Sequence, residues 1–136
     1  MKKSACLLIS CLLLVVALNG QKRHKGNVTA HHQTGVQYGT ASFYSNKFQG
    51  RPTANGKVYD KNKMTCAHNS LPFGTWVKVT NLGNKRTVTV MVTDRLHHKN
   101  KRLIDLSGAA AAKLGYIKRG LAKVKVEVLP NGPGSE

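Results

Sequence analysis

Three segments of alternating β-branched residues limit most strongly how this 136-residue chain can fold. Valine alternates with lysine or threonine in Thr75–Thr80 (TWVKVT), Arg86–Thr93 (RTVTVMVT) and Ala122–Leu129 (AKVKVEVL). A period of two places the valines on one face of a strand, so each segment predicts a strand with one buried face. Turn-forming residues at Asn81–Lys85 (NLGNK) separate the first two strands.

A fourth strand is expected at Tyr38–Tyr44 (YGTASFY), where the alternation is weaker. One helix is expected at Ala109–Leu114, because Ser107 can cap its start and Gly115 can end it. Many short strands with one or two short helices favour a small β-barrel. The predicted fold class is therefore mainly β.

Two further side chains are interpreted from their place in these elements. Trp76 is the only tryptophan and lies on an alternating strand, so we expect it to pack in the core. Asp105 precedes the predicted helix, and we expect it to help cap the helix start.

The first 20 residues predict export. Two lysines precede an apolar stretch, Ala5–Leu18, that is shorter than the ~20 residues needed to span a bilayer and matches the apolar region of a secretory signal. We expect cleavage after Gly20 and export of the mature chain. Lipid attachment at Cys11 is the alternative, but seven apolar residues follow this cysteine, which favours cleavage.

Cleavage would leave Cys66 as the single cysteine, so no intrachain disulfide is expected and Cys66 should be a small buried apolar residue. Residues 21–37 are basic and polar without apolar periodicity and predict a flexible tether. The barrel should then occupy residues 38–130, and residues 131–136 should form a disordered tail.

The charge balance is strongly basic, with 22 Lys and Arg against 5 Asp and Glu and a formal net charge of +17. Such a surface favours weak association with an anionic envelope. Nucleic acid is not expected as a partner, because the lysines are spread through strands and loops without a recognised nucleic-acid-binding motif. Any acid/base chemistry must use one of the five carboxyl groups, which are those of Asp60, Asp94, Asp105, Glu127 and Glu136.

Seven short motifs follow one another along the chain. They are Gly39–Tyr44 (GTASFY), Phe48–Gly56 (FQGRPTANG), Met64–His68 (MTCAH), Leu71–Thr75 (LPFGT), Val79–Asn81 (VTN), Val92–Arg95 (VTDR) and Ile104–Ser107 (IDLS). Together they resemble the rare lipoprotein A (RlpA) family over about Tyr38–Leu129.

The resemblance implies a six-stranded double-psi β-barrel, akin to the catalytic-like domain of expansins. It also implies a location in the periplasm or cell envelope and a lytic transglycosylase that acts on peptidoglycan glycan strands. No metal or cofactor is implied. No peptidoglycan-binding SPOR domain is expected, because the chain ends seven residues after Leu129.

Lytic transglycosylases cleave the MurNAc–GlcNAc bond without water, because the 6-hydroxyl of the sugar attacks its own anomeric carbon. One carboxyl group can then act first as acid and afterwards as base. Ordinary glycosidases need a spaced pair of carboxyl groups. A chain with so few acids is compatible with chemistry that uses one.

Asp94 is the candidate catalytic residue, since it follows the strand Val88–Thr93 and the resemblance places the key aspartate here. The alternative is a surface ion pair with Arg95. A free carboxyl group has a pKa of ~3.9, which is low for a general acid, so the catalytic hypothesis requires partial burial.

The candidate substrate-binding residues are His68, Asp60, Tyr44, Asn55 and Arg95. The resemblance places His68 beside the aspartate across a groove, where it could bind sugar hydroxyls or orient the carboxyl group. Tyr44 could stack on a sugar and Asn55 could hydrogen-bond to one. Asp60 could line the groove or form an Asx turn.

Two positions depart from the family pattern. The family usually has glutamate after Asn-Gly or Ser-Gly, whereas Gly56 is followed here by Lys57. The usual Asp-Arg-Gly-Pro turn is replaced by Asp94–His98 (DRLHH). Because a lysine cannot replace a carboxylate as proton acceptor, a non-catalytic, expansin-like wall-binding module is the alternative function.

Overall fold

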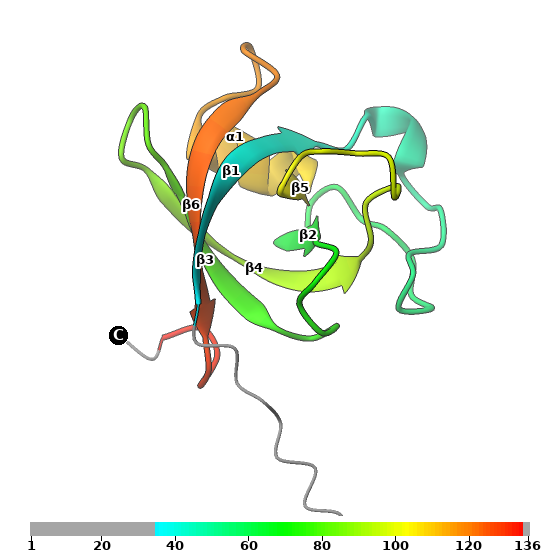
Figure 1. Ribbon diagram of the computed structural model, residues 1–136. Helices are drawn as coiled ribbons and strands as arrows, with labels where there is room; N and C mark the ends of the chain where they lie inside the picture. Colours follow the sequence, from blue (N-terminus) through cyan, green and yellow to red (C-terminus); the bar gives the residue numbers. More distant parts are fainter. Residues whose placement is uncertain (1–34, 135–136) are drawn as a thin grey trace, which may run out of the picture. The chain divides into compact units, whose positions relative to one another are not determined.

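The computed structural model describes residues 35–134, which fold into a closed six-stranded barrel with one α-helix (Figure 1). The elements along the chain are β1 (Val36–Phe43), a short 3-10 helix (Asn46–Phe48), β2 (Thr65–Ala67), β3 (Trp76–Asn81), β4 (Thr87–Asp94), β5 (Ile104–Leu106), α1 (Gly108–Leu114) and β6 (Ala122–Leu129). The strand order around the barrel is β1-β5-β2-β4-β3-β6. The prediction of a mainly β, six-stranded double-psi barrel with one or two short helices is confirmed.

Parallel and antiparallel pairing together bring the ends of β1 and β4 near each other. β1 pairs with β5 and β2 pairs with β4 in parallel, while β2 and β5 are antiparallel. One row of paired residues therefore runs Ser42–Asp105–Ala67–Asp94 across four strands. As a result, Asp94 and the residues that follow β1 are close in space although about fifty positions apart in sequence.

The barrel interior is formed by the alternating valines. In β3, β4 and β6 the inward positions are fully or almost fully buried, and they are Val77, Val79, Val88, Val90, Val92, Val124 and Val126. Cys66 is buried among them, as predicted. Residues Ala110, Ala111 and Leu114 of α1 pack against the same core.

The helix α1 begins and ends as its sequence predicts. The Ser107 side chain accepts a hydrogen bond from the Ala110 backbone N–H at 3.3 Å. Gly115 ends the helix in the left-handed conformation, with φ of 81°. Gly115 therefore supplies the backbone geometry that residues with a side chain rarely adopt.

Several boundaries differ from the prediction. β1 begins at Val36, so the last two residues of the predicted tether, Val36 and Gln37, belong to the barrel and pair with Glu127 and Val126. β2 and β5 have three residues each, too short for alternation to reveal them. Most of the predicted tether, the predicted signal segment and Cys11 lie outside the described residues. Of the predicted tail, 131–134 are described, and the Gly132 N–H donates to the Leu129 carbonyl oxygen at 3.2 Å.

Two side-chain predictions were wrong. Trp76 lies on the outer face of the barrel, half-buried, because Val77 and Val79 take the inward positions of β3. Asp105 does not cap α1, since its two carboxylate oxygens accept hydrogen bonds from the Arg102 guanidinium at 2.9 and 3.0 Å.

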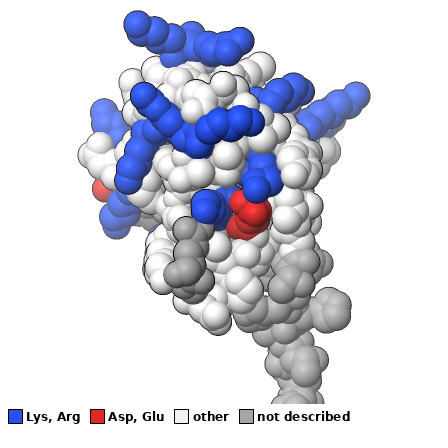
Figure 2. Space-filling model, turned by 90° about the vertical axis from the view of Figure 1, so that its left-hand side faces the viewer, with Lys and Arg blue, Asp and Glu red and all other residues white. Residues whose placement is uncertain are grey.

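Basic side chains are spread over the barrel surface. Figure 2 shows one face on which Lys and Arg far outnumber Asp and Glu. The outward positions of β3 and β6 contribute Lys78, Lys123 and Lys125, and Lys125 forms an ion pair with Glu127 at 3.0 Å. Between residues 35 and 134 no helix is long and apolar enough to cross a membrane.

We predict that Gly39→Ala destabilises the barrel. A Cβ atom at position 39 would lie 2.6 Å from the Leu103 Cβ, so β1 or the segment leading into β5 must move. We expect a loss of about 1–3 kcal/mol in the free energy of unfolding, measured by chemical denaturation. Gly35→Ala is the matched control, because no atom lies within 4 Å of the new Cβ. Equal stability of the two variants would contradict the packing described here.

Candidate functional site

Asp94 is the last residue of β4, and three donors converge on its half-buried carboxylate. The Tyr44 hydroxyl donates to Oδ2 at 2.7 Å. The backbone N–H groups of Ala54 and Arg95 each donate to Oδ1 at 2.8 Å. These contacts hold the carboxyl group in one orientation at the end of the barrel strand.

Tyr44 follows β1 and is held by other aromatic rings. Its ring stacks on Tyr59, with centroids 4.5 Å apart, and meets Phe48 edge to face at 5.7 Å. Burial, followed by the hydrogen bond and the negative charge of Asp94, raises the pKa of Tyr44 far above its ordinary value of 10.0. The phenol therefore keeps its proton at neutral pH and remains a donor to Asp94.

The loop opposite Tyr44 is built around Asn55. The Asn55 Oδ1 accepts hydrogen bonds from the Thr53 hydroxyl at 2.6 Å and from the Lys57 N–H at 3.1 Å. The Asn55 N–H donates to the Thr93 carbonyl oxygen at 3.2 Å. This arrangement fixes the loop against the end of β4 and presents the Ala54 N–H to Asp94. Contact of Asn55 with a sugar remains a prediction.

The His68 side chain is 2% exposed and both its ring nitrogens have protein partners. Nδ1 lies 3.2 Å from the Ser70 N–H and 3.3 Å from the Leu71 N–H, and Nε2 lies 2.9 Å from the Gln37 side-chain oxygen. These partners assign the proton to Nε2. Burial, followed by the positive charge of Arg95, lowers the pKa of His68 below its ordinary 6.5, so the ring is neutral.

These contacts leave neither nitrogen of the His68 ring for a sugar hydroxyl. His68 meets the site through its backbone instead, because its N–H donates to the Asp94 carbonyl oxygen at 3.1 Å. The residue therefore positions the end of β4 against β2.

Arg95 also acts on the backbone at this end of the barrel. Its Nη1 donates to the carbonyl oxygens of His68 at 2.7 Å and Asp94 at 3.4 Å, and the guanidinium lies 3.9 Å from the ring centroid of Phe73. The ion pairs found among the described residues are Arg102–Asp105 and Lys125–Glu127, and they include neither Asp94 nor Arg95. The surface Asp–Arg pair considered from the sequence is therefore not formed.

Asp60 lies outside the hydrogen-bonded group around Asp94. Its Oδ1 accepts from the Asn62 N–H at 2.9 Å, which is the Asx turn expected as one alternative. Asp60 also lines a cavity of about 410 Å³ that shares Thr53 and Thr93 with the site. Both alternatives for this residue are thus compatible with the structure.

Sequence reasoning missed two contributors to the site. Tyr59 supports Tyr44, and its hydroxyl also accepts from the Gly108 N–H at 3.2 Å. The apolar pair Val58 and Tyr59 in an otherwise polar loop is the signal that could have identified it. The Ala54 N–H left no such signal, because a backbone donor does not depend on the residue type.

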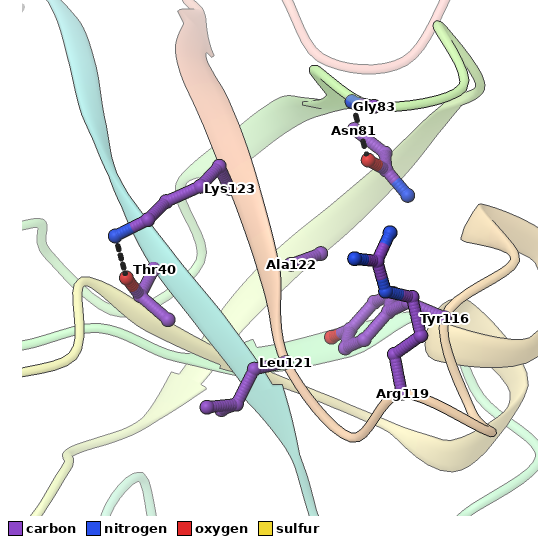
Figure 3. A pocket seen from close by; sticks show the side chains of 8 residues that line it. All are labelled: Thr40, Asn81, Gly83, Tyr116, Arg119, Leu121, Ala122 and Lys123. Carbon is purple, nitrogen blue, oxygen red and sulfur yellow. Dashed lines mark hydrogen bonds between the residues drawn. The ribbon is translucent and has the colours of Figure 1, made fainter.

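A second cavity, of about 330 Å³, lies at the other end of β4 (Figure 3). It is lined by Thr40, Asn81, Gly83, Tyr116, Arg119, Leu121, Ala122 and Lys123. Figure 3 shows Lys123 reaching Thr40, with which it forms a 2.9 Å hydrogen bond. Asn81 ends β3, and the neighbouring Thr80 pairs with Thr87 at the start of β4, so this cavity is separate from the Asp94 site.

The amino-acid sequence matches a known family over most of the barrel. The family model described as "Lytic transglycolase" matches residues 36–126. An endolytic peptidoglycan transglycosylase RlpA from Pseudomonas aeruginosa strain UCBPP-PA14 is 55% identical over 89 residues, which are 65% of this chain and 26% of that protein. The chain thus spans about a quarter of the length of this relative.

Solved structures of different function share the fold. The apo expansin of Clavibacter michiganensis superposes with a TM-score of 0.59 and 26% identity, over 74% of this chain and 53% of the expansin. A Streptomyces papain inhibitor superposes with a TM-score of 0.58 and 25% identity, over 70% of this chain and 94% of the inhibitor. The fold alone therefore does not identify the activity.

We predict that the barrel loses stability as the pH falls through the range in which an unfolded histidine is protonated. The folded-state pKa of His68 lies below that of an exposed histidine, ~6.5. Below that pH the unfolded chain binds more protons, so the free energy of unfolding should decrease from pH 7.5 toward pH ~5. Denaturant titrations at several pH values measure the slope.

His68→Gln should flatten this dependence, although it also lowers stability at neutral pH. His97→Gln, the same substitution at an exposed histidine, is the variant against which the flattening is judged. An unchanged slope in His68→Gln would show that His68 is not the group responsible.

Proposed function

The chain belongs to the lytic transglycolase family as an RlpA-like double-psi β-barrel, and we propose that it cleaves the MurNAc–GlcNAc bond of peptidoglycan without water. The observation that carries this proposal is the Asp94 carboxylate, held by three donors beside a cavity at the end of β4. Of the other acids near the barrel end, Asp105 is bound to Arg102 and Asp60 forms a turn. This arrangement favours chemistry with one carboxyl group.

In the first half of the proposed reaction, Asp94 acts as general acid. Its Oδ1 accepts hydrogen bonds from two backbone N–H groups. These groups are donors only and could not accept a hydrogen bond from a protonated Oδ1. Its Oδ2 faces the Tyr44 hydroxyl, which can donate to a carboxylate or accept from a carboxylic acid. Oδ2 is therefore the oxygen that carries the proton. This proton passes to the O4 atom of the leaving GlcNAc as the bond between C1 of MurNAc and O4 breaks.

In the second half, the same group acts as base. The carboxylate takes the proton of the MurNAc 6-hydroxyl while that oxygen forms a bond to C1. The product is a 1,6-anhydro-MurNAc end. The proton from the 6-hydroxyl replaces the one that Asp94 gave to O4, so Asp94 is again a carboxylic acid. The Ala54 and Arg95 N–H groups and the Tyr44 hydroxyl hold the ionised carboxylate between the two halves.

A non-catalytic wall-binding module is the second candidate function. It is supported by Lys57, which stands where the family usually has glutamate, and by the likeness to the Clavibacter michiganensis expansin. Under this alternative, the barrel would bind glycan strands through the same surface and leave their bonds intact.

We place this activity outside the cytoplasm, in the periplasm or cell envelope. The predicted signal segment supports export, and the basic surface in Figure 2 is suited to retention at an anionic envelope. Retention of this kind should weaken as the salt concentration rises.

We predict that Asp94→Asn abolishes the release of 1,6-anhydro products from peptide-free glycan strands. Asparagine keeps the size of the side chain but cannot exchange the proton, so the fold and binding to strands in a pull-down should persist. Products are measured by mass spectrometry. Wild-type activity in the variant would remove Asp94 from the mechanism, and absence of products from the wild type would favour the wall-binding module.

We predict that Tyr44→Phe lowers the rate of product formation about tenfold to a hundredfold, the loss expected from removing one hydrogen bond to a charged group. The stacking on Tyr59 should be retained. Tyr38→Phe is the matched control, because Tyr38 is 68% exposed on the outer face of β1. Equal rates for the two variants would exclude a role for the Tyr44 hydroxyl.

A further inference from the structure

The turn between β3 and β4 and the segment from the end of α1 to the start of β6 form one end of the barrel. We call residues 82–87 and 113–123 the basic end. The Asn84 side-chain amide donates to the Leu114 carbonyl oxygen at 3.0 Å, and the Leu82 N–H donates to the Lys123 carbonyl oxygen at 2.9 Å. In Figure 1 the orange loop between α1 and β6 projects at the top, whereas the end of β4, with Asp94, lies at the right. The basic end is therefore a surface separate from the Asp94 site.

The basic end carries six positive charges and no negative one. Neither residues 61–93 nor residues 106–126 include an Asp or a Glu. Within residues 35–134, none of the basic side chains of this end forms an ion pair. All of them are exposed, and they are Lys85, Arg86, Lys113, Lys118, Arg119 and Lys123. Figure 2 shows Lys and Arg side chains gathered at the top of the molecule, the height at which Figure 1 places the loop. Such a surface attracts an anionic partner.

Two large aliphatic side chains are exposed in the same loop. Ile117 is 43% exposed and Leu121 is 52% exposed, and Lys118 and Arg119 lie between them in the sequence. A soluble polyanion would leave both aliphatic side chains in water. A bilayer of anionic lipids presents negative headgroups above apolar acyl chains, so it can bind the charges and bury the aliphatic groups together. The combination favours a bilayer as the partner.

The cavity of about 330 Å³ described above opens at this end. Arg119 and Leu121 line it from the loop, and Asn81 and Gly83 line it from the end of β3 and the turn that follows (Figure 3). The Arg119 guanidinium forms no hydrogen bond or ion pair within the described part of the chain. A guanidinium binds phosphate oxygens well. The cavity therefore leaves space for a lipid headgroup beside a free donor.

We propose that the basic end docks the barrel on a bilayer that contains anionic phospholipids. Ile117 and Leu121 insert between the headgroups, and Lys118 and Arg119 bind their phosphates. Docking in this way leaves the Asp94 site uncovered, because that site lies at the other end of β4. General attraction between a basic protein and an anionic surface would need neither Ile117 nor one particular end of the barrel.

Binding to vesicles tests the proposal. The chain from Gln21 is used, since this form is expected after cleavage and lacks the apolar N-terminal segment, which would itself bind lipid. It is sedimented at ~0.1 M salt with vesicles of phosphatidylcholine, either alone or mixed with phosphatidylglycerol. We expect at least about tenfold tighter binding to the vesicles with phosphatidylglycerol, because each basic side chain near an anionic surface adds to the attraction.

The charged contact is tested with Lys118→Gln combined with Arg119→Gln, which should weaken binding to the anionic vesicles about tenfold or more. Lys99→Gln combined with Lys101→Gln is the matched control, because it removes two exposed charges from the loop after β4, and it should weaken binding much less. Equal weakening by the two pairs would overturn the proposal, since total charge would then govern binding. Circular dichroism checks the fold of every variant.

The aliphatic contact is tested with Ile117→Ser, which should weaken binding about threefold to tenfold through lost apolar burial. Val36→Ser is the control, because Val36 is 53% exposed in β1 and outside the basic end, and it should bind as the wild type does. Wild-type binding by Ile117→Ser would overturn docking on a bilayer and indicate a contact through charge alone, such as a soluble polyanion makes. Equal binding to both kinds of vesicle would also overturn it. The measurement contains no glycan, so its result is independent of the proposed transglycosylase activity.

Discussion

The hydrogen bonds to the Asp94 carboxylate join parts of the chain that no local interaction could bring together. Tyr44 and Ala54 lie 50 and 40 positions before Asp94, and each contacts a different carboxylate oxygen. The contacts are possible because β2 and β5 lie between the ends of β1 and β4 in the barrel. The site therefore depends on the order of the strands, and a barrel with another connectivity would separate these donors from the carboxylate.

A second set of contacts, made by His68 and Arg95, holds the end of β4 that carries Asp94. The imidazole of His68 is hydrogen-bonded to the side chain of Gln37 in β1. The His68 backbone N–H donates to the carbonyl oxygen of Asp94 in β4. The Arg95 guanidinium donates to the carbonyl oxygens of both His68 and Asp94 and so links them a second time. His68, which the family resemblance suggested for substrate contact, links two strands in this structure. Its loss would disturb the Asp94 site without any contact between its ring and a substrate.

Much of the fold follows from the sequence because alternation of valine is a direct consequence of one buried strand face. β3, β4, β6 and α1 were predicted on this ground or from capping residues. β2 and β5 could not be, because three residues do not establish a period; their motifs were visible only as parts of a family resemblance. The prediction for Trp76 was wrong because alternation defines two strand faces without saying which one holds the largest side chain. In β3 the valines occupy the buried face, so Trp76 lies on the outer one.

Prediction of the site was less complete, because several of its contacts join residues that are distant in sequence or involve backbone groups. Asp94 and Tyr44 were identified, and they form a hydrogen bond. The partners of His68 were not, because Gln37 lies 31 positions away in a segment without a strand pattern. The Ala54 N–H could not be predicted at all. Since an expansin and a papain inhibitor share this fold, such local contacts, rather than the barrel, carry the argument for function.

The central claim is that one carboxyl group at the end of β4 cleaves the glycan bond without water. The most direct test is to incubate the full chain with peptide-free glycan strands in water labelled with oxygen-18 and to analyse the new ends by mass spectrometry. The account predicts 1,6-anhydro ends without incorporated label. Labelled reducing ends would contradict it by identifying a hydrolase, and intact strands that remain bound would identify a wall-binding module.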